Sequence, residues 1–196
     1  MTDTAASVRA PRPSDNPYLG GNYAPVEQEL TAFDLRVTGE IPADLEGRWL
    51  RNGPNPGSDI DPAVHHWFLG AGMVHGVRLR GGRAEWYRNR RVVGDDGTSP
   101  NTNVGGFAGT TWAMVEAGTP PVELGYELDS LGTNRFSGTL PNGFSAHPKY
   151  DPATGELHAM AYHWPDLVDH IQYVVVGTDG RVSKALDIPV PDMPMI

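Results

Sequence analysis

The sequence contains no cysteine and no long apolar run, and both absences narrow the classes of protein to which it can belong. With Cys 0 among 196 residues, disulfides and thiolate-bound metals are excluded, so any metal must be bound by nitrogen or oxygen ligands. No stretch approaches the ~20 apolar residues of a membrane-spanning helix. The first fifteen residues lack the apolar core of a secretory signal. These features predict a cytoplasmic protein whose only possible membrane contact is peripheral.

Positive charge is also scarce. The chain has 15 Lys and Arg against 24 Asp and Glu, a net charge of −9. Because nucleic-acid binding depends on clustered Lys and Arg at the phosphates, we expect no nucleic-acid partner. The one basic run, "RNRR" from Arg88 to Arg91, is interpreted as the solvated face of a strand.

No segment has the pattern of a long amphipathic helix, whereas 24 Gly and 18 Pro indicate many turns and short elements, which favours β structure. The Pro-, Ala- and Ser-rich residues 1–30 are predicted to form a flexible N-terminal arm, and residues 31–196 a β domain. The segment 73–80 places Met73, His75, Val77 and Leu79 on one strand face and Arg78 and Arg80 on the other, and Gly81-Gly82 then predicts a two-residue hairpin loop. Further strands are predicted at 48–51, 110–116, 122–128, 156–163, 171–176 and 181–188.

From Phe144 onward, four short segments follow one another through short loops. They are a strand around 145–150 and the strands 156–163, 171–176 and 181–188. Four antiparallel strands in about 45 residues are typical of one β-propeller blade. The strand density fits a β-sandwich equally well, so that alternative stays open. In a propeller, His147 would lie on or beside the inner strand of its blade, facing the axial channel.

The seven histidines form no complete local metal site, because neither HExxH nor HxH occurs. His158, His163 and His170 are interpreted as strand-face or loop residues, and His65 and His66 as loop residues that could pair with Asp59 or Asp61. The sequence also lacks a Gly-x-Ser-x-Gly elbow, a P-loop and GxGxxG spacing. His147, in "NGFSAHPKYDPATGEL", is from its surroundings either a loop residue or a metal ligand.

Four segments in order resemble the carotenoid cleavage oxygenase family: "IPADLEGRWLRNGPNP" from Ile41, "HHWFLGAGMVHGVRLRGGRAEWYRNR" from His65, "NTNV" from Asn101 and "FSAHPKYDPATGEL" from Phe144. The resemblance implies an all-β fold, a seven-bladed β-propeller of which this chain supplies the first blades. It covers less than half of a family member. The chain is therefore expected to be the N-terminal part of the oxygenase, truncated at the C-terminus and lacking its remaining blades.

The same resemblance implies a site. In the family, Fe(II) is held by four histidines without a carboxylate ligand, and His147 matches the first. Glu116, in "TWAMVEAG", matches a glutamate that accepts the other ring N–H of a ligand histidine, here one beyond Ile196. The implied reaction is oxidative cleavage of a conjugated C=C bond of a carotenoid or apocarotenoid by O2. Because three ligands are missing, the isolated chain is expected to be inactive.

Departures from the family pattern keep alternatives open. Leu69 and Ala71 stand where relatives usually have Asp. Trp86 and Val115 stand where stilbene-cleaving members use a tyrosine and a lysine, so a stilbene-type dioxygenase ranks below an enzyme acting on an apolar polyene. A non-catalytic β-sheet binding module or a remnant is the other alternative. The exposed edges of a truncated propeller also predict poor solubility or aggregation.

Overall fold

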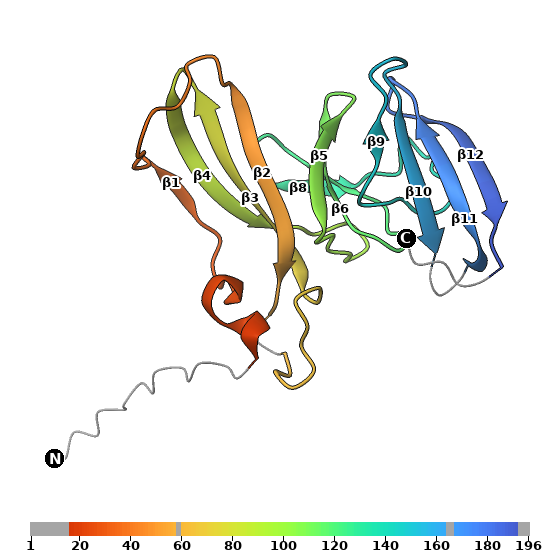
Figure 1. Cartoon of the computed structure of the whole chain (residues 1–196), viewed down its shortest axis with the longest axis horizontal. Helices are drawn as coiled ribbons and strands as arrows, with labels where there is room; N and C mark the ends of the chain where they lie inside the picture. The colour runs from red at the N-terminus through yellow and green to blue at the C-terminus, as the bar shows by residue number, and fades with distance from the viewer. Residues whose placement is uncertain (1–15, 58–59, 164–166, 192–196) are drawn as a thin grey trace.

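Three four-stranded antiparallel sheets make up the described part of the chain, residues 16–57, 60–163 and 167–191 of a computed structural model (Figure 1). The predicted all-β fold is confirmed. In the order of strand pairing, the first sheet consists of β1 (Thr31–Phe33), β4 (Arg83–Arg91), β3 (Ala71–Arg80) and β2 (Gly47–Asn55). The second sheet consists of β5 (Asn103–Phe107), β6 (Thr110–Met114), β7 (Val122–Leu124) and β8 (Ser130–Thr133). The third sheet consists of β12 (Val182–Pro189), β11 (Leu167–Val176), β10 (Leu157–His163) and β9 (Lys149–Tyr150).

The predicted hairpin forms the centre of the first sheet. Arg80 pairs with Arg83 across Gly81-Gly82, and both glycines have positive φ, as a type I′ turn requires. The two faces of β3 are buried to different degrees. Val74 is fully buried, whereas His75 and Val77 are only half-buried, because the other face of β3 packs on the second sheet.

The second sheet differs most from the prediction. β5 and β8 were not predicted, nor was β1 in the first sheet, because all three strands are short and β5 and β8 also contain Gly. The strand predicted at 122–128 ends at Leu124, since Gly125 N–H donates to the Asp129 carbonyl and reverses the chain. The strand predicted at 110–116 ends at Met114.

The third sheet is the predicted four-strand meander. β10, β11 and β12 pair in sequence, and β9 pairs with β10. The strand predicted around 145–150 is only Lys149–Tyr150. His147 therefore lies just before the edge strand β9 rather than within it.

Two apolar cores join the sheets. The first and second sheets enclose Val74, Trp86, Val122 and Leu128. The second and third enclose an aromatic group in which the ring centroids of Trp112 and Phe136 are 5.0 Å apart and those of Phe136 and Phe144 are 4.9 Å apart. Aromatic rings bury large areas in contacts of this kind. Phe144 thus anchors the segment that leads to His147.

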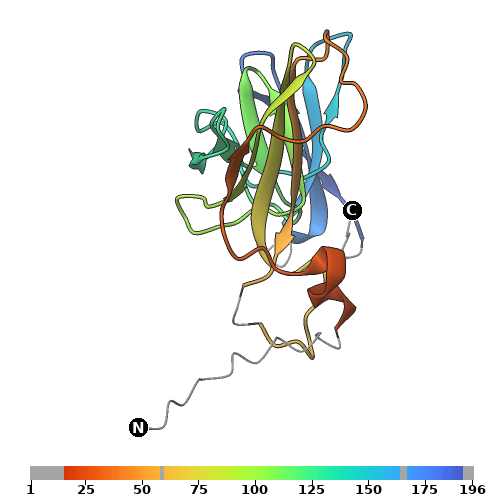
Figure 2. The ribbon, with the colours of Figure 1, turned by 90° about the vertical axis from the view of Figure 1, so that its left-hand side faces the viewer.

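Residues 16–30, predicted as part of a flexible arm, are held on the first sheet. They include the short 3-10 helices η1 (Pro17–Leu19) and η2 (Gly21–Tyr23), which lie beside the β2–β3 connection in both views (Figure 2). The Val26 N–H donates to Asn55 Oδ1, and Asn55 Nδ2 donates back to the Val26 carbonyl. Residues 1–15 of the predicted arm lie outside the described residues.

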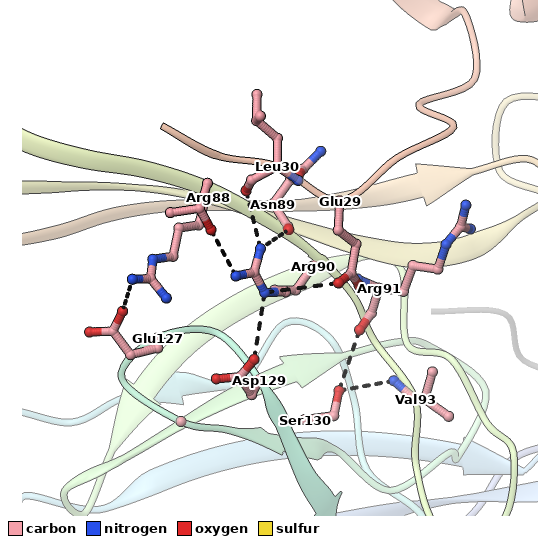
Figure 3. Close-up of polar contacts among 12 residues, drawn as sticks. Glu29, Leu30, Arg88, Asn89, Arg90, Arg91, Val93, Glu127, Asp129 and Ser130 are labelled. Atoms are coloured by element: carbon pink, nitrogen blue, oxygen red, sulfur yellow. Dashed lines mark hydrogen bonds and ion pairs between the residues drawn. The ribbon is translucent and has the colours of Figure 1, made fainter. Parts of the chain in front are cut away.

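An arginine on β4 connects this segment to the second sheet (Figure 3). Arg90 donates to the Leu30 carbonyl at 3.1 Å, and its Nε lies 3.9 Å from Glu29 and 3.5 Å from Asp129. Nearby, Arg88 pairs with Glu127 at 2.5 Å. Arg88 and Arg90 of the basic run are therefore engaged in intramolecular ion pairs, whereas Arg91 is exposed as predicted. Among the described residues, no helix is long and apolar enough to cross a membrane.

Candidate metal site

Glu116 and His147 come together at one end of the second and third sheets. Glu116 follows β6 and His147 precedes β9, so both lie on the connections outside the strands. A carboxylate oxygen of Glu116, Oε1, contacts His147 Nδ1. The sequence paired Glu116 with a histidine beyond the chain, whereas the structure places it against His147. A carboxylate on one ring nitrogen fixes the tautomer and orientation of an imidazole.

The two side chains differ in exposure. The Glu116 side chain is 24% exposed and that of His147 64%. The carboxylate is therefore held within the protein while the imidazole extends from it. With Nδ1 facing Glu116, the Nε2 nitrogen is the one available to a further ligand.

Two glycines bring these connections into contact. A Cβ on Gly143 would lie 1.7 Å from the Gly118 carbonyl oxygen, so the two backbones touch directly. Gly118 itself has φ +79, a left-handed conformation that favours glycine. Gly118 lies two residues after Glu116, and Gly143 lies four residues before His147. The close approach of the two glycines therefore sets the distance between Glu116 and His147.

The other described histidine side chains face protein partners. His75 Nδ1 lies 2.8 Å from the Tyr87 hydroxyl, and His158 Nδ1 lies 2.7 Å from the Tyr173 hydroxyl. His170 Nδ1 lies 2.8 Å from Asp169. Burial, and then the charge of Arg51, lower the pKa of His75. Burial thus disfavours the imidazolium form there.

Among the described residues, His65 and His66 form no side-chain pair with Asp61, one of their two predicted partners. The Asp61 carboxylate accepts from the Ala63 N–H, and the ring of His66 packs against Tyr18 and Phe68, with centroids 5.0 and 5.1 Å away. His65 is buried, at 7% exposure. Asp59 lies outside the described residues, as does the side chain of His163.

The sequence did not indicate that Tyr162, near the end of β10, lies within the electrostatic influence of Glu116. Tyr162 is 8% exposed. Burial, and then the negative charge of Glu116, raise the pKa of its hydroxyl. The only signal in the sequence was its place at the end of a predicted strand, which does not show that this end meets Glu116.

The residues that depart from the family pattern lie in different surroundings. Trp86 is 5% exposed and belongs to the core between the first two sheets. Val115 directly precedes Glu116 and is half-buried. Leu69 and Ala71 are exposed. Of these positions, Val115 is adjacent in sequence to the candidate site.

The described residues contain no group of three or more His, Cys, Asp or Glu side chains that could hold a metal. They do contain an oriented imidazole with a carboxylate on Nδ1. This arrangement suits one ligand of a shared site, because ligand histidines commonly direct their second ring nitrogen to a carboxylate.

Comparison with known proteins identifies relatives of the whole chain. The family model described as retinal pigment epithelial membrane protein matches residues 23–96 and 92–196. A carotenoid cleavage oxygenase of Mycobacterium tuberculosis (strain ATCC 25618 / H37Rv) is 49% identical over 203 residues, which cover 93% of this chain and 40% of the relative. The chain therefore spans about two fifths of that relative's length.

Solved structures show the same fold. The lignostilbene dioxygenase of Pseudomonas brassicacearum superposes with a TM-score of 0.82 at 26% identity, covering 95% of this chain and 45% of that one. Cobalt-substituted Synechocystis ACO gives a TM-score of 0.70 at 19% identity, covering 87% of this chain and 44% of that one. The three sheets are thus part of a β-propeller of this type.

Proposed function

The chain belongs to the carotenoid cleavage oxygenase family, that of the retinal pigment epithelial membrane protein, and from this premise we propose that the protein cleaves a conjugated C=C bond of a carotenoid or apocarotenoid with O2. The observation that carries the proposal is the contact between Glu116 and His147 Nδ1. This contact joins two residues that the family resemblance singled out independently. Glu116 follows β6 of the second sheet, and His147 precedes β9 of the third.

In this proposal, His147 is one of four histidine ligands of Fe(II) and binds through Nε2. Glu116 accepts the Nδ1 proton, holds the ring in that tautomer and offsets part of the metal's positive charge. One neighbour of the same fold, Synechocystis ACO, was crystallised in cobalt-substituted form, which supports a metal in proteins of this fold. Fe(II), when bound, supplies the redox chemistry that activates O2 toward the double bond.

The proposal assigns the remaining ligands to a part of the protein outside this chain, which covers 40% of the mycobacterial oxygenase. Without those ligands, a single imidazole binds Fe(II) weakly. We therefore expect the 196-residue chain by itself to be inactive.

The residue that precedes Glu116, Val115, favours an apolar polyene over a phenol as the substrate. Val115 offers neither a positive charge nor a hydroxyl to a phenol, whereas an apolar side chain suits a polyene bound mainly by burial of apolar surface. The second candidate is a stilbene-type substrate. The lignostilbene dioxygenase, at a TM-score of 0.82, favours it.

The test uses protein expressed from the complete reading frame that contains this sequence. We expect about one Fe(II) per chain, O2 consumption, and two carbonyl products from a carotenoid or apocarotenoid, separated by chromatography. His147→Ala should abolish iron retention and cleavage. The matched control His158→Ala, which removes an imidazole held by Tyr173, should retain both.

Two results would argue against the proposal. Cleavage of a stilbene but of no polyene would establish the second candidate. A folded protein that binds a polyene but neither iron nor O2 would establish a non-catalytic binding module instead.

A further inference from the structure

The amide of Asn103 crosses from the second sheet to the segment that carries His147. Asn103 is the first residue of β5, and its Nδ2 donates to the Ala146 carbonyl at 2.7 Å. Ala146 is fully buried. Because the peptide bond between Ala146 and His147 is planar, fixing this carbonyl also fixes the plane from which the His147 side chain departs.

The same peptide unit is held on its other side. The His147 N–H donates to Ser145 Oγ at 3.2 Å. Both polar groups of the peptide that joins residues 146 and 147 therefore have partners. This peptide can rotate only if both hydrogen bonds break.

The orientation of the Asn103 amide is itself determined. Its Oδ1 accepts from the Val104 N–H at 2.8 Å, so the NH2 group must face the Ala146 carbonyl. The Asn103 backbone carbonyl accepts from Asn52 Nδ2 at 3.2 Å, and the same Nδ2 donates to the Pro100 carbonyl at 3.0 Å. Asn52 lies on β2 and is 8% exposed. A path of hydrogen bonds thus connects the first and second sheets to the peptide that precedes His147.

We infer that Asn103 is a positioning residue for His147, an inference that rests on the proposed function of His147 as an iron ligand. The imidazole is 64% exposed, so side-chain packing restricts it little. Its direction is set by the peptide that Asn103 holds and by the carboxylate of Glu116. Removal of the Asn103 side chain keeps both His147 and Glu116 in the protein. It frees the Ala146 carbonyl, and with it the peptide bond from which the His147 side chain departs.

The test compares Asn103→Ala with Asn101→Ala in protein from the complete reading frame. Asn101 is a matched control because its Nδ2 also donates to backbone carbonyls, those of Phe68 at 3.2 Å and Gly70 at 2.8 Å, but those carbonyls lie away from His147 in sequence. Hydrogen exchange of the amides of residues 143–148 reports the mobility of the segment. Titration with Co2+ alone, as a spectroscopic substitute for Fe(II), reports affinity and ligand geometry through its visible absorption.

We expect Asn103→Ala to accelerate exchange in residues 143–148, to weaken Co2+ binding about tenfold or more, and to change the Co2+ spectrum, while Asn101→Ala does none of these. Unchanged exchange and an unchanged spectrum in Asn103→Ala would overturn the inference, as would equal changes in Asn101→Ala. If the parent protein binds no Co2+, the proposed function fails, and the exchange measurement still decides whether Asn103 holds the segment.

Discussion

At the scale of single residues, the site consists of a half-buried carboxylate and an exposed imidazole brought together by backbone geometry. Glu116 and His147 are 31 positions apart in the sequence, and neither lies on a strand. Their contact depends on Gly118 and Gly143, whose backbones touch, and on the hydrogen bonds of the Ala146–His147 peptide. The family resemblance identified both carboxylate and imidazole, but the glycines and Asn103 became significant only in the structure.

Glu116→Gln should weaken metal binding in protein from the complete reading frame. The amide keeps the size of the side chain but loses the charge that favours a proton on His147 Nδ1, so we expect metal affinity to fall about 10- to 100-fold. Competition with a chelator measures this change. Glu123→Gln is the control, because Glu123 bonds Asn134 and does not contact His147. Equal affinities in parent and Glu116→Gln would refute a role for this carboxylate.

Gly143→Ala should destabilise the protein. The new Cβ would lie 1.7 Å from the Gly118 carbonyl oxygen, and the two connections must separate to admit it. Forcing atoms into a packed region costs about 1–3 kcal/mol or more of unfolding free energy. Urea denaturation measures the loss. Gly53→Ala, where nothing lies within 4 Å of the added Cβ, should leave stability nearly unchanged; a similar loss there would contradict the explanation.

At the scale of elements, side-chain amides join segments that the strands leave unpaired. Asn89 is 2% exposed. Its Oδ1 accepts from the Leu30 N–H, and its Nδ2 donates to the Gln28 carbonyl at 3.3 Å. Together with Asn55, it holds residues 26–30 along the first sheet and so leads the chain into β1.

Asn89→Ala should release this segment. The Leu30 N–H and the Gln28 carbonyl would lose their partners in a partly buried place, which costs about 1–3 kcal/mol per unsatisfied group. We expect a lower denaturation midpoint and faster hydrogen exchange at residues 28–33. Asn22→Ala, at an exposed position in η2, is the control. Unchanged exchange at residues 28–33 in Asn89→Ala would show that the amide does not hold the segment.

At the scale of the whole molecule, the outer sheets bury one face each. The first and third sheets pack on the second through the two apolar cores, while their other faces carry exposed apolar side chains. Trp49 on β2 is 59% exposed and Met160 on β10 is 37% exposed. Exposed apolar patches of this kind favour association.

The 196-residue chain should therefore self-associate with rising concentration, as measured by sedimentation velocity. Replacing Trp49 and Met160 together by Lys should shift the distribution toward monomer, because a charge on each open face opposes apolar contact. Leu45→Lys, at a loop position that is 49% exposed, is the control for added charge alone. A parent chain that stays monomeric at all concentrations would contradict this prediction.

Much of the fold followed from local patterns. The hairpin at Gly81-Gly82 and the meander from β9 to β12 were predictable because turn residues and alternation are encoded within a few positions. The weakly patterned strands β1, β5 and β8 were not, because three to five residues containing Gly, Ser or Thr resemble loops until a neighbouring strand pairs with them. The C-terminal end of β7 was also not predicted, because it is determined by the turn that follows Leu124.

The sequence by itself determined the chemistry available to this protein: nitrogen and oxygen ligands in the absence of cysteine, antiparallel β structure, and the identity of His147 and Glu116 as candidates through their motifs. Only the tertiary structure decided that the carboxylate of Glu116 faces His147 and that Asn103 holds the peptide before it. The physical reason is that these contacts join different sheets. They depend on how closely two backbones approach at Gly118 and Gly143, which no local pattern records.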